Sequence, residues 1–548
     1  MLIMRSTISL VALATLAACA PEYASELLPL DQEAAGATGV EGAALDEHYP
    51  TDRVLRYEIE LAPELLAAMQ ADPLCEGAPP CGDEYVEATF RYGDQVFEKV
   101  GLRFKGNSSR WSLSRLGPDD PGYLRYSYKV KFDEFVDDQS LGGIEKLNLN
   151  NLWSDATYMR ERLSLDLFRA AGVPASRLAY VNLYVNSVHA GLYVSVQQVD
   201  ERFLATWFDD DEGDLFKPEG GDLIYKGDDI ASYGGAEAYE LKTNEDESDH
   251  SRLLHLIDVL NNTPDAEFEQ AIRALFDVEG FLGWLAVNNA LVALDSYAGP
   301  FPHNFYLYDD PSSGRFAYIP WDLNNSFGGF NCGLSNQELM HMSSAVPYCQ
   351  TGGGPGGGGM YVGNRPLISR LLEVPGFAQR YRDKIGQLLD GDFAPETMSA
   401  AIDRWRDLIE EHVAADSNPF YGYEAFVRSL DEAGDRFMGL RPFIAERHAF
   451  LRAELDGDIS AYCGDGACSA GEDCEGDCTE PECPPCQVFL GEAGHCVPTC
   501  ADACTCPDDA PVPLTCDPQR GLCIPGCHSD ADCPQQAPTC DVASSTCH

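Results

Sequence analysis

Cysteine is spread so unevenly along this chain of 548 residues that it divides the sequence into two parts with different means of stabilisation. Sixteen of the 21 cysteines lie between Cys463 and Cys547, and the 462 residues before them hold the other five. The cysteine-rich part lacks a substantial apolar core, so disulfides at ~2–4 kcal/mol each are expected to stabilise it. The longer part can bury a core, because a hydrophobic content of 45% is ordinary for a globular protein.

The first 18 residues have the parts of a secretory signal peptide, namely Arg5, an apolar run over 8–18 and small residues before Cys19. The run is shorter than the ~20 apolar residues of a membrane-spanning helix. Leu-Ala-Ala-Cys at 16–19 resembles the bacterial lipobox, which implies cleavage before Cys19 and its lipidation. An ordinary signal peptide with an incidental cysteine is the alternative. Export also favours disulfides over zinc, the other explanation of so much cysteine.

We therefore expect an exported protein of the cell envelope that acyl chains hold to a membrane. Ala20 stands where an aspartate would signal retention in the inner membrane, which favours the outer membrane. The predicted order is a signal peptide over 1–18, a flexible tether over 19–50, a folded domain over 51–457 and a cysteine-rich tail over 458–548. The formal net charge of −52 argues against nucleic acid as a partner, since such proteins need basic surfaces.

Hydrophobic periodicity predicts an α+β domain, with strands first and helices after them. Residues 54–61, 85–104 and 125–135 alternate apolar and polar positions, a helix is expected over 154–171, and two strands over 180–185 and 191–199 complete a mixed antiparallel sheet. The later helices are expected over 251–262, 265–276, 278–293, 365–390 and 395–455, with a strand pair over 304–308 and 316–319. This is the layout of a kinase-like fold, although layout alone is weak support for a function.

Two aspartates and one amide stand at the ends of adjacent elements. Asp295 follows a hydrophobic helix, Asn304 begins a strand and Asp322 ends the next one. Such oxygen ligands suit Mg²⁺, which usually takes one or two carboxylates together with phosphate oxygens. Each residue also has a structural alternative: Asp295 could cap a turn, Asp322 could form an Asx turn, and Asn304 could be a satisfied strand-end amide.

Six strings of residues, in order from about 53 to 455, resemble those of the CotH (spore-coat protein H) family of atypical kinases. They are RFKGNSS at 103–109, YKVKF at 128–132, RERLSLDLFRAAGV at 160–173, a hairpin over 181–200, LFKP at 215–218, and DS, HNFYLY, IPWDLN and FG within 295–328. The resemblance implies a two-lobe protein-kinase-like fold, with a sheet-rich N-lobe and a helical C-lobe. It implies transfer of phosphate from ATP, with Mg²⁺ or Mn²⁺, to Ser or Thr of envelope or secreted proteins.

The resemblance also implies roles for the polar residues of these strings. Asp295 would be the catalytic aspartate and Asp322 the metal ligand, and Asn304 could take a second ion. Positioning and charge neutralisation of this kind are most of what phosphoryl transfer asks of a protein.

A lysine of the first lobe is expected to contact the nucleotide. Lys129 and Lys131 share one strand face, so parity cannot choose between them, and either could simply be solvated. Glu161, on one helix face with Leu165 and Phe168, could pair with the lysine or could be a surface residue. The further candidates for phosphate contact are Asn107, Ser108, Ser109 and Lys217.

Three departures from the family pattern leave a second function open. Asn324 and Gln197 stand where acidic residues are common in the family, and about four extra residues (298–301) lengthen the loop after Asp295. A pseudokinase that acts as a surface-binding or structural lipoprotein is therefore the alternative. A hydrolase or other metal enzyme is disfavoured, because the chain has no HExxH motif or close pair of histidines that would build a zinc site.

Four cysteines of the folded domain are disulfide candidates. Cys75 and Cys81 flank a Gly-Ala-Pro-Pro loop and are expected to pair, and Cys332 and Cys349 are further candidates. The string CGDGAC followed by GEDC within 463–474 resembles modules of myxobacterial surface proteins, which implies adhesion, spacing or substrate docking. Asp465, Glu472 and Asp473 could bind Ca²⁺ there or form ordinary polar loops.

Overall fold

The computed structural model describes residues 45–457 apart from 78, 247, 346, 350, 354–358, 362–364 and 433–437, together with six short strands between 487 and 547. The signal peptide, Cys19, the tether up to 44, the tail's disulfides and its calcium candidates lie outside the described residues. Leu45 and Tyr49 are buried, so the folded domain begins a few residues before position 51. Within the described part of the chain, no helix is both long and apolar enough to cross a membrane.

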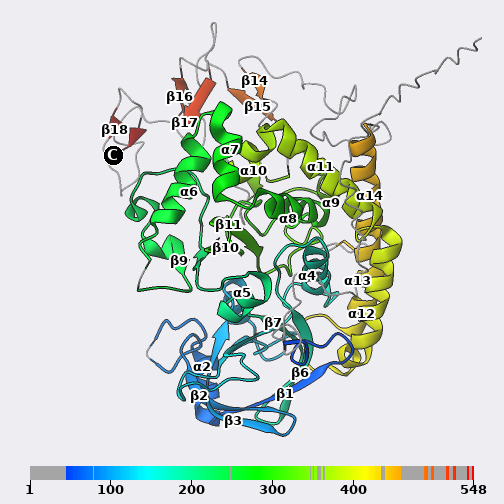
Figure 1. Ribbon diagram of the computed structural model, residues 1–548. Helices are drawn as coiled ribbons and strands as arrows, with labels where there is room; N and C mark the ends of the chain where they lie inside the picture. The colour runs from blue at the N-terminus through cyan, green and yellow to red at the C-terminus, as the bar shows by residue number, and fades with distance from the viewer. Residues whose placement is uncertain are drawn as a thin grey trace, which may run out of the picture.

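The first strands close into a seven-stranded barrel, drawn in blue and cyan in Figure 1. In chain order they are β1 (Leu55–Glu60), β2 (Val86–Tyr92), β3 (Gln95–Lys105), β4 (Ser127–Lys131), β5 (Lys146–Asn150), β6 (Leu178–Val185) and β7 (Val188–Gln197). Their order around the barrel is β1-β2-β3-β4-β5-β7-β6, with β1 and β6 parallel. Alternation places apolar side chains such as Leu102 and Phe104 inside and polar ones outside.

The closed barrel corrects the expectation of a mixed antiparallel sheet of a kinase N-lobe. Closure depends on the pairing of Leu55 with Val181, which are far apart in the sequence, and on β5. The sequence KLNLN of β5 alternates over five residues only, too short a run to be identified from its pattern. The coarser prediction of an α+β domain is confirmed.

Short helices accompany the barrel: α2 (Pro63–Ala71), α3 (Ser108–Leu113), α4 (Arg160–Ala170) and α5 (Glu201–Trp207). Helix α4 begins six residues later than the predicted residue 154. Ser154 has a left-handed backbone, with φ of 66°. The side chain of Asp155 accepts the backbone N–H groups of Thr157 and Arg160, both at 2.9 Å, and so fixes the entry into the helix.

A four-stranded sheet of order β11-β10-β8-β9 and a set of helices form the second part. Its strands are β8 (Asp214–Pro218), β9 (Tyr239–Leu241), β10 (Phe305–Asp310) and β11 (Arg315–Pro320). Its helices are α6 (Ser251–Asn262), α7 (Asp265–Leu275), α8 (Val278–Leu291), α9 (Asn336–Met340), α10 (Pro366–Glu373), α11 (Pro375–Asp390), α12 (Pro395–Ala415), α13 (Tyr423–Asp431) and α14 (Leu440–Asp456). Helix α8 is buried at every residue except Glu279 and Gly280 in its first turn, and it forms the centre of this part.

The helices over 251–262, 265–276 and 278–293 agree with prediction to within two residues, whereas the two longest ones are divided. Pro375 begins α11 where one helix over 365–390 was expected, because proline is favoured in a helix's first turn and disfavoured inside it.

The remaining described elements are the 3₁₀ turns at Ile230–Tyr233 and Ala236–Ala238, and the strands β12 (Thr351–Gly353), β13 (Gly359–Tyr361), β14 (Gln487–Leu490), β15 (His495–Pro498), β16 (Leu514–Asp517), β17 (Leu522–Pro525), β18 (Cys540–Asp541) and β19 (Thr546–Cys547).

A buried ion pair ties the barrel to the later helices. Arg125, just before β4, donates to Asp416, just after α12, at 2.7 Å, and both side chains are inaccessible to solvent. Asp416 also accepts the backbone N–H of Leu192 in β7 at 3.0 Å. Figure 1 shows α12 in yellow reaching down beside the barrel. The two parts are therefore joined on this side by a charged, fully enclosed contact.

The disulfide expected between Cys75 and Cys81 is confirmed, and the further candidates Cys332 and Cys349 prove to be partners of each other. The backbone N–H of Cys349 donates to the carbonyl of Ala298 at 2.9 Å. The second disulfide therefore lies against the lengthened loop at 298–301, close in sequence to Asp295.

Candidate active site

Asp295 is held in one orientation by residues that follow it in the chain. It lies in the loop after α8. Its carboxylate is hydrogen-bonded through Oδ1 to the ring nitrogen Nε2 of His303 and through Oδ2 to the side-chain amide of Asn325, both at 2.8 Å. Asn304 donates its amide to the backbone carbonyl of Asp295, also at 2.8 Å. Burial alone would lower the pKa of His303, but its hydrogen bond to Asp295 and the charges of Asp295 and Asp322 raise it above the ordinary value. His303 and Asn325 were not predicted as site residues.

Asp322 follows β11 in a left-handed backbone conformation, with φ of 56°. Asn304 has a similar φ of 59°, and its backbone carbonyl accepts the Trp321 backbone N–H at 2.9 Å. Positive φ is uncommon for residues other than glycine, although Asn and Asp adopt it more often than most. Among the described residues, no hydrogen bond or ion pair holds the Asp322 carboxylate, which solvent can reach. The surrounding protein nevertheless raises the pKa of Asp322 by desolvation, Lys105 opposes this shift, and Asp295 adds to it.

Lys105 is the basic residue that affects the pKa of Asp322 most strongly. It was not among the site residues predicted from the sequence. It is the last residue of β3, and its ammonium group donates to the Asn150 side-chain oxygen at 2.7 Å. The Asn150 amide in turn donates to the Glu161 carboxylate at 3.3 Å. Burial lowers the pKa of Lys105, which Asp322 and Glu161 oppose. A lysine and a glutamate thus meet through an amide bridge beside Asp322.

Glu161 lies at the start of α4 and is buried, so it is not a surface residue. Burial raises the pKa of Glu161, Asp322 raises it further, and Lys105 and the Asn150 hydrogen bond lower it. A backbone hydrogen bond from Leu323 also lowers it, which fixes Glu161 against the turn that carries Asp322.

The two lysines that parity could not separate are separated by their partners. Lys129 donates to the Gln198 side-chain oxygen at 3.2 Å. Among neighbouring charges, that of Lys105 lowers the pKa of Lys129 the most. Lys131 pairs instead with Glu134 at 2.9 Å, which raises the pKa of Lys131. The structure therefore brings Lys129 to the site and leaves Lys131 apart.

The other candidates for phosphate contact lie around the same point. Lys217 on β8 forms an ion pair with Glu219, and the charge of Lys217 lowers the pKa of Lys105. Asn107, Ser108 and Ser109 directly follow Gly106 at the beginning of α3 and are exposed or partly exposed. The Asn107 side chain makes no capping hydrogen bond with the helix.

The residues fit a cation that phosphate oxygens help to bind. No group of three or more His, Cys, Asp or Glu side chains within the described ranges could hold a metal without other ligands. Asp322 offers an unbonded carboxylate, and the Asn304 amide oxygen is left available because its nitrogen is the atom bonded to Asp295. One or two protein oxygens with phosphate oxygens is the arrangement usual for Mg²⁺.

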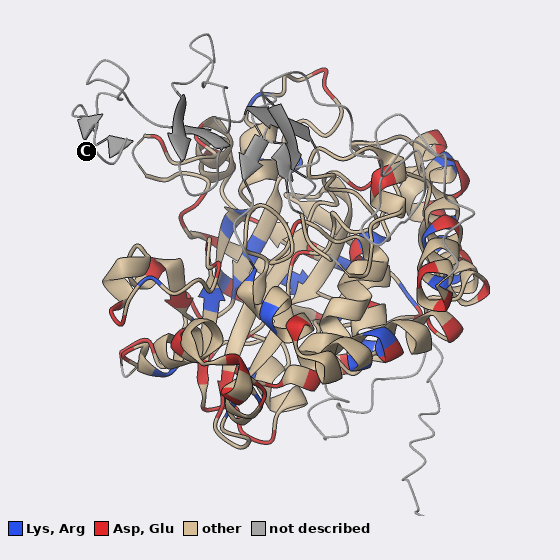
Figure 2. Cartoon of the chain, turned by 90° about the horizontal axis from the view of Figure 1, so that it is seen from above, with Lys and Arg blue, Asp and Glu red and all other residues tan. Residues whose placement is uncertain are grey.

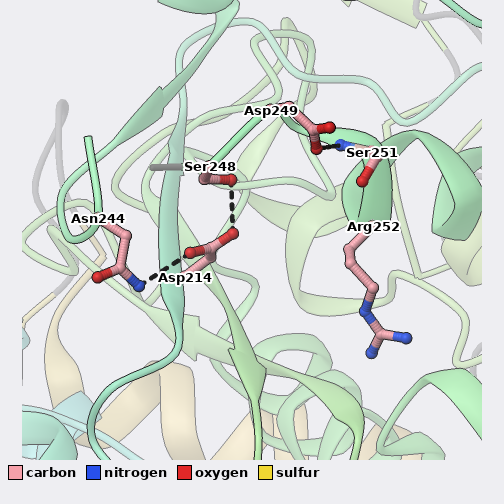
Figure 3. Close-up of a pocket in the computed structure, with 6 residues that line it drawn as sticks. All are labelled: Asp214, Asn244, Ser248, Asp249, Ser251 and Arg252. Carbon is pink, nitrogen blue, oxygen red and sulfur yellow. Dashed lines mark hydrogen bonds between the residues drawn. The ribbon is translucent and has the colours of Figure 1, made fainter. Parts of the chain in front are cut away.

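A pocket of about 290 Å³ opens at the other end of β8 from Lys217. Figure 3 shows its lining residues, which are Asp214, Asn244, Ser248, Asp249, Ser251 and Arg252. The Asp214 carboxylate already accepts Asn244 and Ser248, and Arg252 is paired with Asp309. Because these groups are satisfied, the cluster around Asp295 and Asp322 is the better candidate for chemistry.

Comparison with known proteins agrees with this choice. Residues 102–451, more than half of the chain, match the family model described as CotH kinase protein. The chain is 26% identical over 321 residues to the inner spore coat protein H of Bacillus subtilis (strain 168), covering 56% of this chain and 79% of that protein. It is 24% identical over 337 residues to the inner spore coat protein H-like protein of the same organism, covering 60% and 85%. The chain with this arrangement of Asp295, Asp322 and Lys105 belongs to the CotH family.

Proposed function

We propose that this protein is an atypical kinase that transfers phosphate from ATP to serine or threonine of envelope or secreted proteins. The observation that carries the proposal is the unbonded carboxylate of Asp322, whose pKa is affected both by the charge of the fixed Asp295 and by Lys105 of the Lys105–Asn150–Glu161 bridge. Charges of both signs are thus positioned within one site, as phosphoryl transfer requires. Barrel and helical part correspond in this proposal to the two lobes of a kinase.

Each residue then has a defined task. Asp295 orients the substrate hydroxyl and accepts its proton, which it can do because a carboxylate oxygen has a further lone pair beside the one bonded to His303 or Asn325. Lys105 binds phosphate oxygens, and the amide bridge to Glu161 holds it in place. Asp322, with Asn304, would hold Mg²⁺ or Mn²⁺, which when bound neutralises charge on the phosphates.

A non-catalytic surface-binding protein of the same fold is the second candidate, favoured by Asn324 in place of an acidic residue. The Asn324 amide donates to the backbone carbonyl of Trp153 at 3.1 Å, so it joins the turn after β11 to the segment between β5 and α4. Gln197 is buried in β7, where it accepts the Arg177 backbone N–H at 3.1 Å. Both substitutions thus have structural partners, which supports the kinase over this alternative.

We also propose that the protein acts outside the cytoplasm, anchored by a lipid on Cys19, at the outer membrane. The lipobox-like sequence supports the anchor. The names of the two relatives as spore coat proteins support a surface location. Calcium binding and docking by the cysteine-rich tail remain predictions from the sequence.

Replacing Lys105 by methionine is expected to lower kcat/KM for ATP about 100-fold or more, because a positioned charge on the phosphates is lost. ATP affinity should fall about tenfold, the cost of one charge-assisted hydrogen bond. Calorimetry of ATP binding with Mg²⁺ and initial rates of phosphate transfer measure the two effects.

The matched control for Lys105→Met is Lys131→Met, which removes a lysine from the neighbouring strand that pairs with Glu134 outside the site. Its rate and affinity should remain within about twofold of the original protein, since this partly exposed pair lies outside the site. Equal losses in the two variants would contradict the assignment of Lys105.

A further inference from the structure

Three lysines on the outer face of the barrel lack an acidic partner. Lys105, Lys129 and Lys146 lie on β3, β4 and β5, and within the described ranges no carboxylate oxygen lies within 4.0 Å of their ammonium groups. Lys105 and Lys129 bond instead to the uncharged amides of Asn150 and Gln198. In a chain with 89 acidic and 37 basic residues, carboxylates are plentiful, so their absence here points to an external anion.

Further positive charge gathers at the same face. Arg103 lies directly opposite Lys129 in the register of β3 and β4, a placement that disfavours two like charges, and Asp83 pairs with Arg103 at 2.6 Å but not with Lys129. Burial, followed by the charges of Lys105, Arg103, Lys146 and Lys242, lowers the pKa of Lys129 to about 7. Figure 2 shows Lys and Arg close together near the middle of the molecule, with Asp and Glu mainly on the surrounding helices and loops. A bound anion would relieve this repulsion.

The three lysines extend away from the reacting carboxylates. The charges of Asp322 and Glu161 raise the pKa of Lys105, whereas the charges that affect the pKa of Lys129 most strongly are positive. From the strand spacing and rise, the backbone positions of Lys105 and Lys146 are about 16 Å apart, a span longer than a triphosphate group. The charge of Lys146 opposes the rise in the pKa of Asp200 that burial causes, yet a nucleotide lying along this face would place its uncharged base, and no phosphate, beside Lys129 and Lys146.

We propose that the donor site also accepts inorganic polyphosphate, a linear polyanion whose terminal phosphate lies at Asp322 and whose chain runs past Lys105 to Lys129 and Lys146. The inference rests on the proposed kinase function and names a second donor for the same site. The serine oxygen forms a bond to the terminal phosphorus, and the bond from that phosphorus to the bridging oxygen breaks. The shortened polyphosphate leaves with the electron pair, and Asp295 takes the hydroxyl proton.

The test uses the mature chain, residues 19–548, without nucleotide. Calorimetry compares tripolyphosphate with long-chain polyphosphate, and mass spectrometry detects phosphoserine and phosphothreonine formed from either donor or from ATP. Long-chain polyphosphate should bind at least about tenfold more tightly than tripolyphosphate and should phosphorylate the protein or an added acceptor. The double variant Lys129→Gln with Lys146→Gln should weaken long-chain binding about 100-fold and tripolyphosphate binding much less.

Lys131→Gln is the matched control and should leave both affinities unchanged. The double variant should melt at the same temperature as the original protein or higher, because it removes like charges. Should it melt lower, Lys146→Gln alone is used, with an expected loss of about tenfold in long-chain affinity.

The outcomes separate the two proposals. If phosphate is transferred from ATP, but polyphosphate neither binds nor donates phosphate, this inference is overturned and the kinase proposal stands. Polyphosphate binding with an affinity that depends neither on chain length nor on Lys129 and Lys146 would also overturn it. Chain-length-dependent binding without transfer from any donor would overturn the donor role together with the kinase proposal.

Discussion

Asp322→Asn is expected to reduce phosphate transfer from ATP about 1,000-fold or more, equivalent to about 4 kcal/mol of transition-state stabilisation. The substitution keeps the shape of the side chain and removes the charge of the one site carboxylate that no described residue binds. Initial rates at saturating ATP measure the effect. Asp295→Asn should cause a loss of similar size, with ATP affinity nearly unchanged, because the proposed mechanism places this residue at the acceptor hydroxyl and not at the nucleotide.

Stability distinguishes this effect from misfolding. The pKa of Asp322 is raised in the folded protein, mainly by desolvation, so its ionised form is disfavoured there relative to the unfolded chain. A neutral asparagine should therefore leave the melting temperature unchanged or raise it. Asp214→Asn, at an aspartate that Asn244 and Ser248 hold outside the site, is the control and should retain the original rate. Equal activity of Asp322→Asn and this control would contradict the role of Asp322.

Arg125→Met is expected to lower the free energy of unfolding by about 3–5 kcal/mol. The substitution leaves Asp416 with a buried charge that has lost its cation, and it breaks the contact between the barrel and α12. Arg125 also donates to the backbone carbonyls of Leu192 and Asn418, so these acceptors lose a partner as well. Denaturant unfolding measures the difference.

A surface pair of the same barrel supplies the comparison. Arg91 on β2 pairs with Glu60 on β1, with both side chains well exposed. Arg91→Met should cost no more than about 1 kcal/mol, since water already solvates both charges. A double-mutant cycle with Arg125→Met and Asp416→Asn should give a coupling energy within about 0.5–3 kcal/mol. If Arg125→Met and Arg91→Met destabilise the protein equally, the buried pair does not join the two parts.

Local patterns in the sequence predicted the elements well and their assembly poorly. Alternation identified β1 and β4, and helical periodicity with flanking turn residues identified α6 and α7. Barrel closure was not predicted, because the parallel pairing of β1 with β6 joins segments more than a hundred residues apart and leaves no local signal. Proline at the start of α11 is a local signal for the division of the helix predicted over 365–390.

The residues of the candidate site also fall into those that the sequence could predict and those that depend on the assembled fold. Asp295 and Asp322 stand at the ends of elements, so the sequence could propose them. Lys105 was inside a quoted string, yet its contact with Asn150 depends on the pairing of β3 with β4 and of β4 with β5. His303 and Asn325 orient Asp295 through a loop conformation that no periodicity describes.

The central claim is that phosphate passes from ATP to a hydroxyl at Asp295 and Asp322. The most direct measurement incubates residues 19–548 with ATP radiolabelled on its terminal phosphate, with Mg²⁺ or Mn²⁺, and follows labelling of the protein itself and of a casein-type acceptor. The account predicts labelling of serine or threonine that is lost in both Asp295→Asn and Asp322→Asn. Absence of ATP binding at millimolar concentration, or labelling that persists in both variants, would contradict it.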